Sequence, residues 1–251
     1  MEETSGKVAC LVIGAGDATG GAIARRFARE GYVTCMTRRT ADKLAPLVEQ
    51  IEAVGGKAIA FGSDARKEDE VIALIEQIES TVGAIEVLVF NNGANVGCSI
   101  LEETARKYFK IWEMACLGGF LNGREVAKRM VARPDAPGGR KGTIIFTGAT
   151  ASLRGAANFA AFAGAKHALR ALAQSMAREL GPRGIHVAHI VIDGAIDTEF
   201  IRSNFPERYA LKGRDGILNP DHIADSYWML HTQPRDAWTH ELDLRPWMEK
   251  F

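Results

Sequence analysis

Residues 8–21 read VACLVIGAGDATGG, so that an apolar run passes directly into a cluster of glycines. The run at 8–13 predicts a buried strand, and the apolar spacing over 21–30 predicts a helix immediately after the glycines. Glycine at such a junction permits a tight turn and lets the pyrophosphate of a dinucleotide approach the backbone. The free N–H groups of the helix would face the phosphates. We therefore expect a dinucleotide-binding turn that includes Gly14, Gly16, Thr19 and Gly20.

The alternation of strand and helix continues along the chain. Short β-branched runs predict further strands at 33–37, 58–62, 87–90, 142–147, 186–192 and 240–244, and helical spacing predicts helices at 41–54, 68–82, 105–133, 156–180 and 220–233. Repeated β-α-β units predict an α/β fold of the Rossmann type, a doubly wound parallel sheet of about seven strands with helices on both faces. The Gly/Pro-rich stretch at 134–142 predicts a surface loop rather than a linker. We expect a single domain over 1–251.

The composition excludes several classes of protein. Lys+Arg and Asp+Glu both number 31, so the basic excess that is typical of nucleic-acid binders is missing. No apolar run reaches the roughly 18–20 residues that span a bilayer, and the short polar stretch at 1–7 is unlike a signal peptide. The four cysteines form no Cys-x-x-Cys pair, and the six histidines show no metal-ligand spacing. We expect a cytoplasmic protein with reduced thiols, no metal, no membrane contact and no nucleic-acid partner.

The second strand ends in Met-Thr-Arg-Arg at 36–39. Sites for NAD usually carry a carboxylate here for the ribose 2′-hydroxyl, whereas sites for NADP carry arginine for the 2′-phosphate. No acid occupies 37–40, and guanidinium donors bind phosphate well. Arg38 and Arg39 therefore favour NADP(H) over NAD(H), the alternative being two solvated arginines on a loop.

Further motifs follow the predicted strands in a fixed order: Asp64, the run Asn-Asn-Gly-Ala at 91–94, Lys166, and Asp-Gly-x-x-x-Thr at 193–198. Together they resemble the short-chain dehydrogenase/reductase family over about 7–244. The glycine turn departs from the family pattern, because typical members carry glycine where Ala18 stands.

The resemblance implies a role in cofactor binding for each of these positions. Asp64 would contact the adenine, Asn91 and Gly93 would lie along the cofactor near its ribose, and Lys166 would hold the nicotinamide ribose hydroxyls. Ile196 and Thr198 would reach the pyrophosphate or the carboxamide.

The family's usual acid–base residues are largely missing. Members that reduce carbonyls use Tyr, Ser, Asn and Lys, but the resemblance places Phe162, Ala149 and Ala115 at the first three positions, so that only Lys166 remains. General acid catalysis typically contributes about 10²–10⁴-fold and one oxyanion donor about 10²–10³-fold. Ordinary ketone reduction through this set of four residues should therefore be very slow.

Three functions remain open. The chain could be an atypical NADPH reductase that delivers hydride to a small apolar substrate such as an enone or imine, or a ketone reductase whose acid has moved. It could also be a cofactor-binding pseudoenzyme that acts as a sensor or partner subunit. We favour the first function, the atypical NADPH reductase, and keep the pseudoenzyme as the alternative. An enzyme is therefore the preferred interpretation.

Replacement proton donors can be named. Beside Lys166 we expect a catalytic role for Asp193, which stands where the family usually has proline, or for Tyr209, in the loop expected to cover the substrate. The alternatives are a turn-forming acid and a surface tyrosine. Three further hydroxyl groups are weaker candidates, with loop capping or helix packing as the alternative: Thr150, Ser152 and Tyr108.

The stretch at about 194–219 predicts an irregular substrate-covering loop, with 200–218 as a mobile lid. An apolar cleft is expected from Phe159, Phe162, Ala149, Phe200, Ile201 and Phe205, although several of these could be ordinary core. The long helices at 105–133 and 156–180 resemble those that pair across subunits in the family, and the second is rich in small residues. We expect a homodimer or homotetramer.

Overall fold

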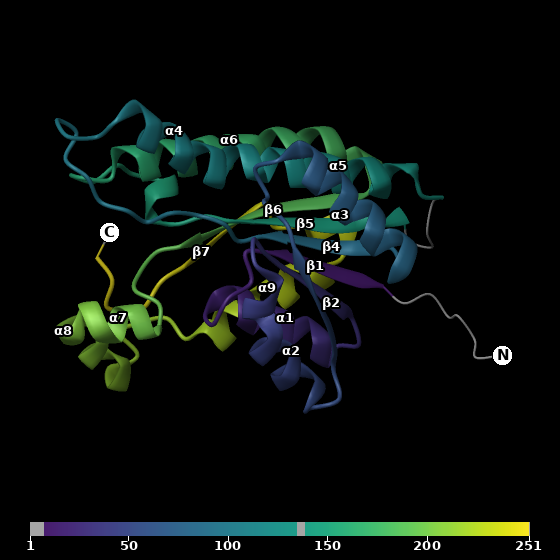
Figure 1. Cartoon of the computed structure of the whole chain (residues 1–251), viewed down its shortest axis with the longest axis horizontal. Helices are drawn as coiled ribbons and strands as arrows, with labels where there is room; N and C mark the ends of the chain where they lie inside the picture. The colour runs from purple at the N-terminus through teal and green to yellow at the C-terminus, as the bar shows by residue number, and fades with distance from the viewer. Residues whose placement is uncertain (1–7, 135–138, 251) are drawn as a thin grey trace.

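Seven strands form one parallel sheet in the order β3-β2-β1-β4-β5-β6-β7 (Figure 1). A computed structural model describes residues 8–134 and 139–250; the predicted N-terminal stretch at 1–7 and the middle of the predicted loop at 134–142 lie outside them. The strands are β1 (Ala9–Ile13), β2 (Val33–Arg38), β3 (Lys57–Gly62), β4 (Ile85–Phe90), β5 (Gly142–Thr147), β6 (Ile185–Ile192) and β7 (Glu241–Leu244). The predicted doubly wound α/β fold is confirmed.

Helices cover both faces of the sheet (Figure 1). One face is covered by α1 (Thr19–Arg29), α2 (Ala45–Glu52) and α9 (Pro220–Thr232), and the other by α3 (Glu68–Thr81), α4 (Ala105–Trp112), α5 (Gly118–Ala132) and α6 (Ala160–Leu180). Because both faces are covered, the central strands are buried along their whole length and are almost continuously apolar. The strand order reverses between β1 and β4, which is where such sheets bind ligands at their carboxyl ends.

Four predicted elements differ from the structure. The predicted helix at 41–54 is a 3-10 turn at Ala41–Leu44 followed by α2. The predicted helix at 105–133 is interrupted by a π-helical turn at Glu113–Leu117, and the predicted helix at 156–180 begins only at Ala160 because 156–159 form a turn with Asn158 at φ +68°. The segment predicted as irregular contains α7 (Glu199–Asn204), α8 (Pro206–Tyr209) and a 3-10 turn at Ala210–Arg214.

The segment at 194–219 lies beyond the carboxyl ends of the strands, with the C-terminal end of the chain beside it (Figure 1). A parallel bridge between Ile196 and Leu218 joins the two ends of the segment. The indole N–H of Trp247 donates to the backbone oxygen of Arg214 at 3.0 Å. The C-terminal residues therefore hold the helical segment over the edge of the sheet.

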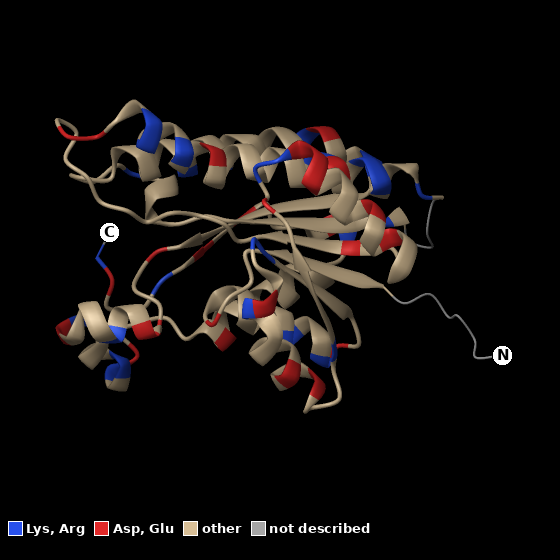
Figure 2. Cartoon of the chain, in the orientation of Figure 1, with Lys and Arg blue, Asp and Glu red and all other residues tan. Residues whose placement is uncertain are grey.

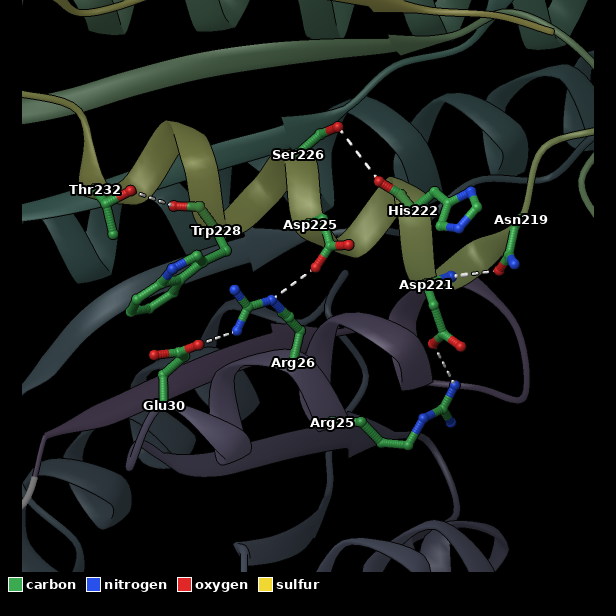
Figure 3. Close-up of polar contacts among 10 residues, drawn as sticks. All are labelled: Arg25, Arg26, Glu30, Asn219, Asp221, His222, Asp225, Ser226, Trp228 and Thr232. Carbon is green, nitrogen blue, oxygen red and sulfur yellow. Dashed lines mark hydrogen bonds and ion pairs between the residues drawn. The ribbon is translucent and has the colours of Figure 1, made fainter.

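Two arginines of α1 attach this helix to α9 (Figure 3). Arg26 Nε donates to Asp225 at 2.8 Å, its Nη1 donates to Glu30, and its guanidinium lies 5.2 Å from the Trp228 ring centroid. Arg25 pairs with Asp221 at 3.2 Å. Since α9 follows the helical segment directly and α1 follows the glycine turn, these contacts connect the two ligand-facing parts of the fold.

We expect Arg26→Ala to lower the free energy of unfolding by about 1 to 2 kcal/mol, because it removes two ion pairs, a cation–π contact and the packing of the side-chain stem. Urea unfolding of the intact chain measures this. Arg25→Ala is the matched control, because it removes a single exposed pair and should cost about 0.5 kcal/mol or less. Equal effects of the two substitutions would contradict the assignment.

Candidate functional site

The glycine turn between β1 and α1 has a conformation that larger residues would not fit. Gly14 has φ +82°, and a β-carbon there would collide with the side-chain oxygen of Asn92. A β-carbon at Gly20 would lie 2.6 Å from the backbone oxygen of Gly14. Asn91 Nδ2 donates to the same oxygen at 3.1 Å, so that the end of β4 braces the turn. The backbone is left open to a ligand.

The N-terminus of α1 carries hydrogen-bond donors without partners. Thr19 is buried, and its hydroxyl has no hydrogen-bond partner among the described residues. No side chain caps the helix at Ala18, and its first turn contains no acid. A buried hydroxyl without a partner beside uncapped N–H groups fits a phosphate group. The sequence prediction for this turn is therefore compatible with the geometry.

A first cavity of about 440 Å³ lies at the ends of β2, β3 and β4. Arg66 binds the carboxylate of Asp64 through two nitrogens at 2.6 and 2.8 Å, which lowers the pKa of Asp64 to about 2. Arg38, Arg39 and Lys43 also line the cavity. Within the described parts of the chain, these three cations make neither a salt bridge nor a side-chain hydrogen bond. The cavity is therefore lined by more cations than acids, since Asp64 is the one carboxylate among the residues that line it. Figure 2 shows how the Lys, Arg, Asp and Glu residues are distributed along the ribbon.

A second, larger cavity of about 1080 Å³ runs from the glycine turn to the helical segment. Phe162 lies in its wall and is only 8% exposed. The residues that pack around it are Phe159, Ala149, Ala151 and Ala163. The position at which the family resemblance expects a tyrosine therefore contributes an apolar surface. Ile196, Thr198, Phe200, Ile201 and Phe205 line the same cavity.

Lys166 lies one turn after Phe162 on α6, and the end of its side chain lies beside Gly93. Its Nζ donates to the backbone oxygen of Thr147 at 2.7 Å and to that of Asn92 at 3.0 Å. Burial lowers the pKa of this amine to about 8. Lys166 is not among the residues that line either cavity, and its Nζ would lie 3.3 Å from a β-carbon at Gly93, which lines the first cavity.

Ala115, which the resemblance aligns with the family's asparagine, is fully buried in the π-helical turn. It packs in an apolar cluster with Ile111, Ala161, Ala165, Ala94 and Trp112. The Ala115 side chain therefore offers no hydrogen-bonding group at the position where the resemblance expects the asparagine.

The candidate donors of the sequence analysis are placed as follows. Asp193 is 3% exposed, accepts from the Thr150 hydroxyl at 2.5 Å and lies 3.5 Å from the Arg245 guanidinium. The Ser152 hydroxyl accepts from the backbone of Ala149 at 3.1 Å. Neither Asp193 nor Ser152 lines a cavity. The same is true of Tyr209, which lies under the ammonium of Lys212, and of Tyr108, which stands against Gly164.

Several residues of the two cavities did not figure in the sequence analysis. Lys43 and Arg66 follow the arginine pair and Asp64 so closely that charge spacing could have indicated them. Arg154, Arg208 and Glu249 line the second cavity from three separate elements, and no pattern in the sequence brings them together.

A family model for short chain dehydrogenases matches residues 7–208. This chain belongs to the short-chain dehydrogenase family. A solved short-chain dehydrogenase from Rhodopseudomonas palustris is 48% identical and superimposes with a TM-score of 0.79, over 96% of this chain and 99% of that one.

Curated relatives in the short-chain dehydrogenase family are more distant. A short-chain dehydrogenase/reductase of Armillaria gallica is 33% identical over 73% of this chain and 69% of its own length. An L-rhamnose 1-dehydrogenase (NAD(P)+) of Azotobacter vinelandii is 32% identical over 78% of this chain and 76% of its own length. The chain is therefore a member of an oxidoreductase family, and these relatives do not identify its substrate.

The described residues of this short-chain dehydrogenase contain no helix of the length and apolar character required to cross a membrane. They also contain no group of three or more His, Cys, Asp or Glu side chains placed to hold a metal ion. The four cysteines are unpaired.

Proposed function

We propose that this short-chain oxidoreductase uses NADP(H) in preference to NAD(H). The observation that carries the proposal is the first cavity, which is lined by Arg38, Arg39 and Lys43, while its carboxylate, Asp64, is bound by Arg66. A ribose 2′-phosphate would bind such a group of cations, whereas a ribose hydroxyl would gain little from it. The L-rhamnose 1-dehydrogenase of Azotobacter vinelandii is named for both nucleotides, which is compatible with either preference.

The remaining contacts of the proposed cofactor come from residues already described. The turn at Gly14, Gly16 and Gly20 with the Thr19 hydroxyl would hold the pyrophosphate, and Asp64 and Asn91 would line the adenosine half. Ile196 and Thr198 would close the other end, where Gly93 and Lys166 stand. When bound, the nicotinamide group supplies or accepts a hydride.

For the reaction, we propose hydride transfer with a small apolar substrate, an enone, imine or ketone, without a tyrosine–serine pair. Phe162 and Ala149 offer an apolar wall and no hydrogen-bond donor, which makes this chain an atypical member of its family. Lys166 is the one retained member of the set. Asp193 and Tyr209 remain the proposed donors, and each would have to exchange its present contacts before reaching the substrate.

A cofactor-binding pseudoenzyme is the second candidate, and one observation favours it. The hydroxyl groups nearest the apolar wall are engaged elsewhere: Thr147 with Tyr227 at 2.7 Å, Thr150 with Asp193, and Ser152 with Ala149. A chain that binds NADPH without turning over any substrate would act as a sensor or partner subunit.

Thermal unfolding with NADPH and NADH, combined with a turnover screen on ketones, enones and imines, separates these functions. The proposed oxidoreductase requires a larger thermal shift with NADPH than with NADH, together with NADPH oxidation in the presence of at least one substrate class. A strong NADPH shift without turnover would favour the pseudoenzyme, and no shift with either nucleotide would contradict both.

Assembly is part of the same proposal. The apolar side chains of Phe109, Tyr108 and Phe120 on α4 and α5 are exposed, with the Phe109 ring stacked on Trp112. Exposed aromatic side chains are enriched at protein interfaces, and we propose a homodimer or homotetramer that uses the helices carrying these three. Light scattering of the intact chain should then give a multiple of 27.2 kDa that falls to the monomer mass in Phe109→Asp with Phe120→Asp. A monomeric parent protein would refute it.

A cytoplasmic location is also proposed, on the support of the four unpaired cysteines. Recovery of the protein from the membrane or the secreted fraction of cells that express it would contradict this location.

A further inference from the structure

The rim of the larger cavity carries two guanidinium groups that the proposed cofactor contacts leave unused. Arg154 follows the 3-10 turn Thr150–Ser152, and Arg208 lies on α8. Both residues line the cavity, and their side chains are 47% and 56% exposed. Arg154 Nη2 donates to the backbone oxygen of Lys250 at 3.4 Å, and Arg208 Nη2 lies 4.0 Å from Glu249 Oε2. Two successive residues of the C-terminal segment thus bring both arginines to one part of the rim.

Most of the hydrogen-bonding capacity of this pair is open. A guanidinium group has five N–H donors. Among the described residues Arg154 makes one side-chain hydrogen bond, with Lys250, and a long ion pair of 3.8 Å with Asp193, which already accepts from Thr150. Arg208 makes no side-chain hydrogen bond within the described parts of the chain and has only its distant ion pair. Both guanidinium groups can therefore receive an anion.

The walls behind the rim are apolar and aromatic. Phe159 and Phe162 form one wall. Phe200 and Phe205 form the opposite side on the helical segment, with ring centroids 5.9 Å apart and both side chains largely exposed. Exposed aromatic rings that face a cavity gain free energy when an apolar ligand covers them. The cavity therefore combines an apolar interior with cations at its mouth.

We propose that the substrate is a carboxylic acid with an apolar body, whose carboxylate binds Arg154 and Arg208 while the body lies between the phenylalanines. The inference rests on the proposed function and narrows its substrate class to unsaturated or oxo acids. Planar guanidinium groups match a carboxylate through paired hydrogen bonds. Two carboxylates oppose this pair: the buried Asp193, 3.8 Å from Arg154, and Glu249, which lines the cavity 4.0 Å from Arg208. Glu249 holds Arg208 near the C-terminal segment and weakens the binding of an anion beside it.

Calorimetry on the intact, NADPH-saturated protein tests this with cinnamate and methyl cinnamate, followed by a panel of aliphatic enoates and their methyl esters. Free acids should bind more tightly than their esters. Arg154→Gln and Arg208→Gln should each raise the Kd for cinnamate at least about tenfold, because each removes a charged hydrogen-bond donor. The Kd for methyl cinnamate should stay unchanged. Glu249→Gln should lower the Kd for cinnamate, a gain in affinity that damage to the fold would not produce.

Arg202→Gln is the matched control, because Arg202 lies on α7 of the same segment, pairs with Glu199 and does not line the cavity. This substitution should change neither the Kd for cinnamate nor the Kd for methyl cinnamate. Equal binding of acids and esters, or binding of neither throughout the panel, would overturn the inference. The inference would also be overturned if Arg208→Gln lowered the affinity for NADPH as much as the affinity for cinnamate, because the arginine would then bind the cofactor. The binding of the acids is also measured without nucleotide. This shows whether the arginines bind a carboxylate even if the proposed NADPH site proves wrong.

Discussion

Replacement of Arg38 and Arg39 together by alanine is expected to raise the Kd for NADPH on the order of 10²-fold or more. A hydrogen bond to a charged group contributes roughly 1.5–3 kcal/mol, and about 1.4 kcal/mol corresponds to a tenfold change in Kd. Both arginines line the first cavity, and Gly16 lies so close to Arg38 that a β-carbon there would be 3.3 Å from its Nη2. The guanidinium group therefore stands directly beside the glycine turn. Titration of protein fluorescence with NADPH and NADH measures both constants.

The Kd for NADH should change by less than about threefold, because a ribose hydroxyl cannot use the lost charge. Arg29→Ala serves as the control: Arg29 ends α1, is exposed and lies outside both cavities. If the double variant lost affinity for both nucleotides equally, the two arginines would not be reading a 2′-phosphate, and the proposed preference for NADP(H) would be wrong.

The parts of this fold that could be predicted are those set by local patterns. The predicted strand at 142–147 coincides with β5, and the predicted helix at 68–82 ends one residue beyond α3, because apolar periodicity within one element is visible in the sequence. The π-helical turn at Glu113–Leu117 is hidden because its apolar residues also fit ordinary helical spacing. The segment at 194–219 carries helix-start signals in its sequence: the Thr198 hydroxyl caps α7 by accepting from the backbone of Ile201, and Pro206 opens α8.

The site residues that could be predicted are likewise those that adjoin a predicted strand. The glycine turn and the arginine pair adjoin strands β1 and β2, so their position at the carboxyl edge followed from the predicted sheet. The environment of Asp193 did not, because it depends on Arg245 from the C-terminal segment and on Thr150 from the turn after β5. Those contacts bury a side chain that the sequence alone presented as a candidate proton donor. Tertiary contacts between distant segments decide which polar groups reach the substrate.

Restoring the family's hydroxyl groups should create a ketone reductase activity. Phe162→Tyr combined with Ala149→Ser is expected to raise NADPH-dependent ketone turnover by about 10²-fold or more, since a general acid and an oxyanion donor each contribute on that scale. The backbone is suited to it. Phe162 Cε2 and Lys166 Nζ lie 3.6 and 3.3 Å from a β-carbon position at Gly93, so a phenol at 162 would stand beside the ammonium group that lowers its pKa.

The matched control adds the same atoms to the same cluster at the wrong positions. Phe159→Tyr with Ala151→Ser introduces one phenol and one hydroxyl among the residues that surround Phe162, without a neighbouring ammonium, and should leave ketone turnover at the parent level. Both double variants are first tested for an NADPH-induced thermal shift, which shows that the fold and the cofactor site are intact. If the Phe162→Tyr and Ala149→Ser variant kept that shift but reduced ketones no faster than its control, the missing hydroxyls would not be what limits the reaction. The limiting element would then be sought at Lys166, whose ammonium group donates to two backbone carbonyls and lies beside Gly93.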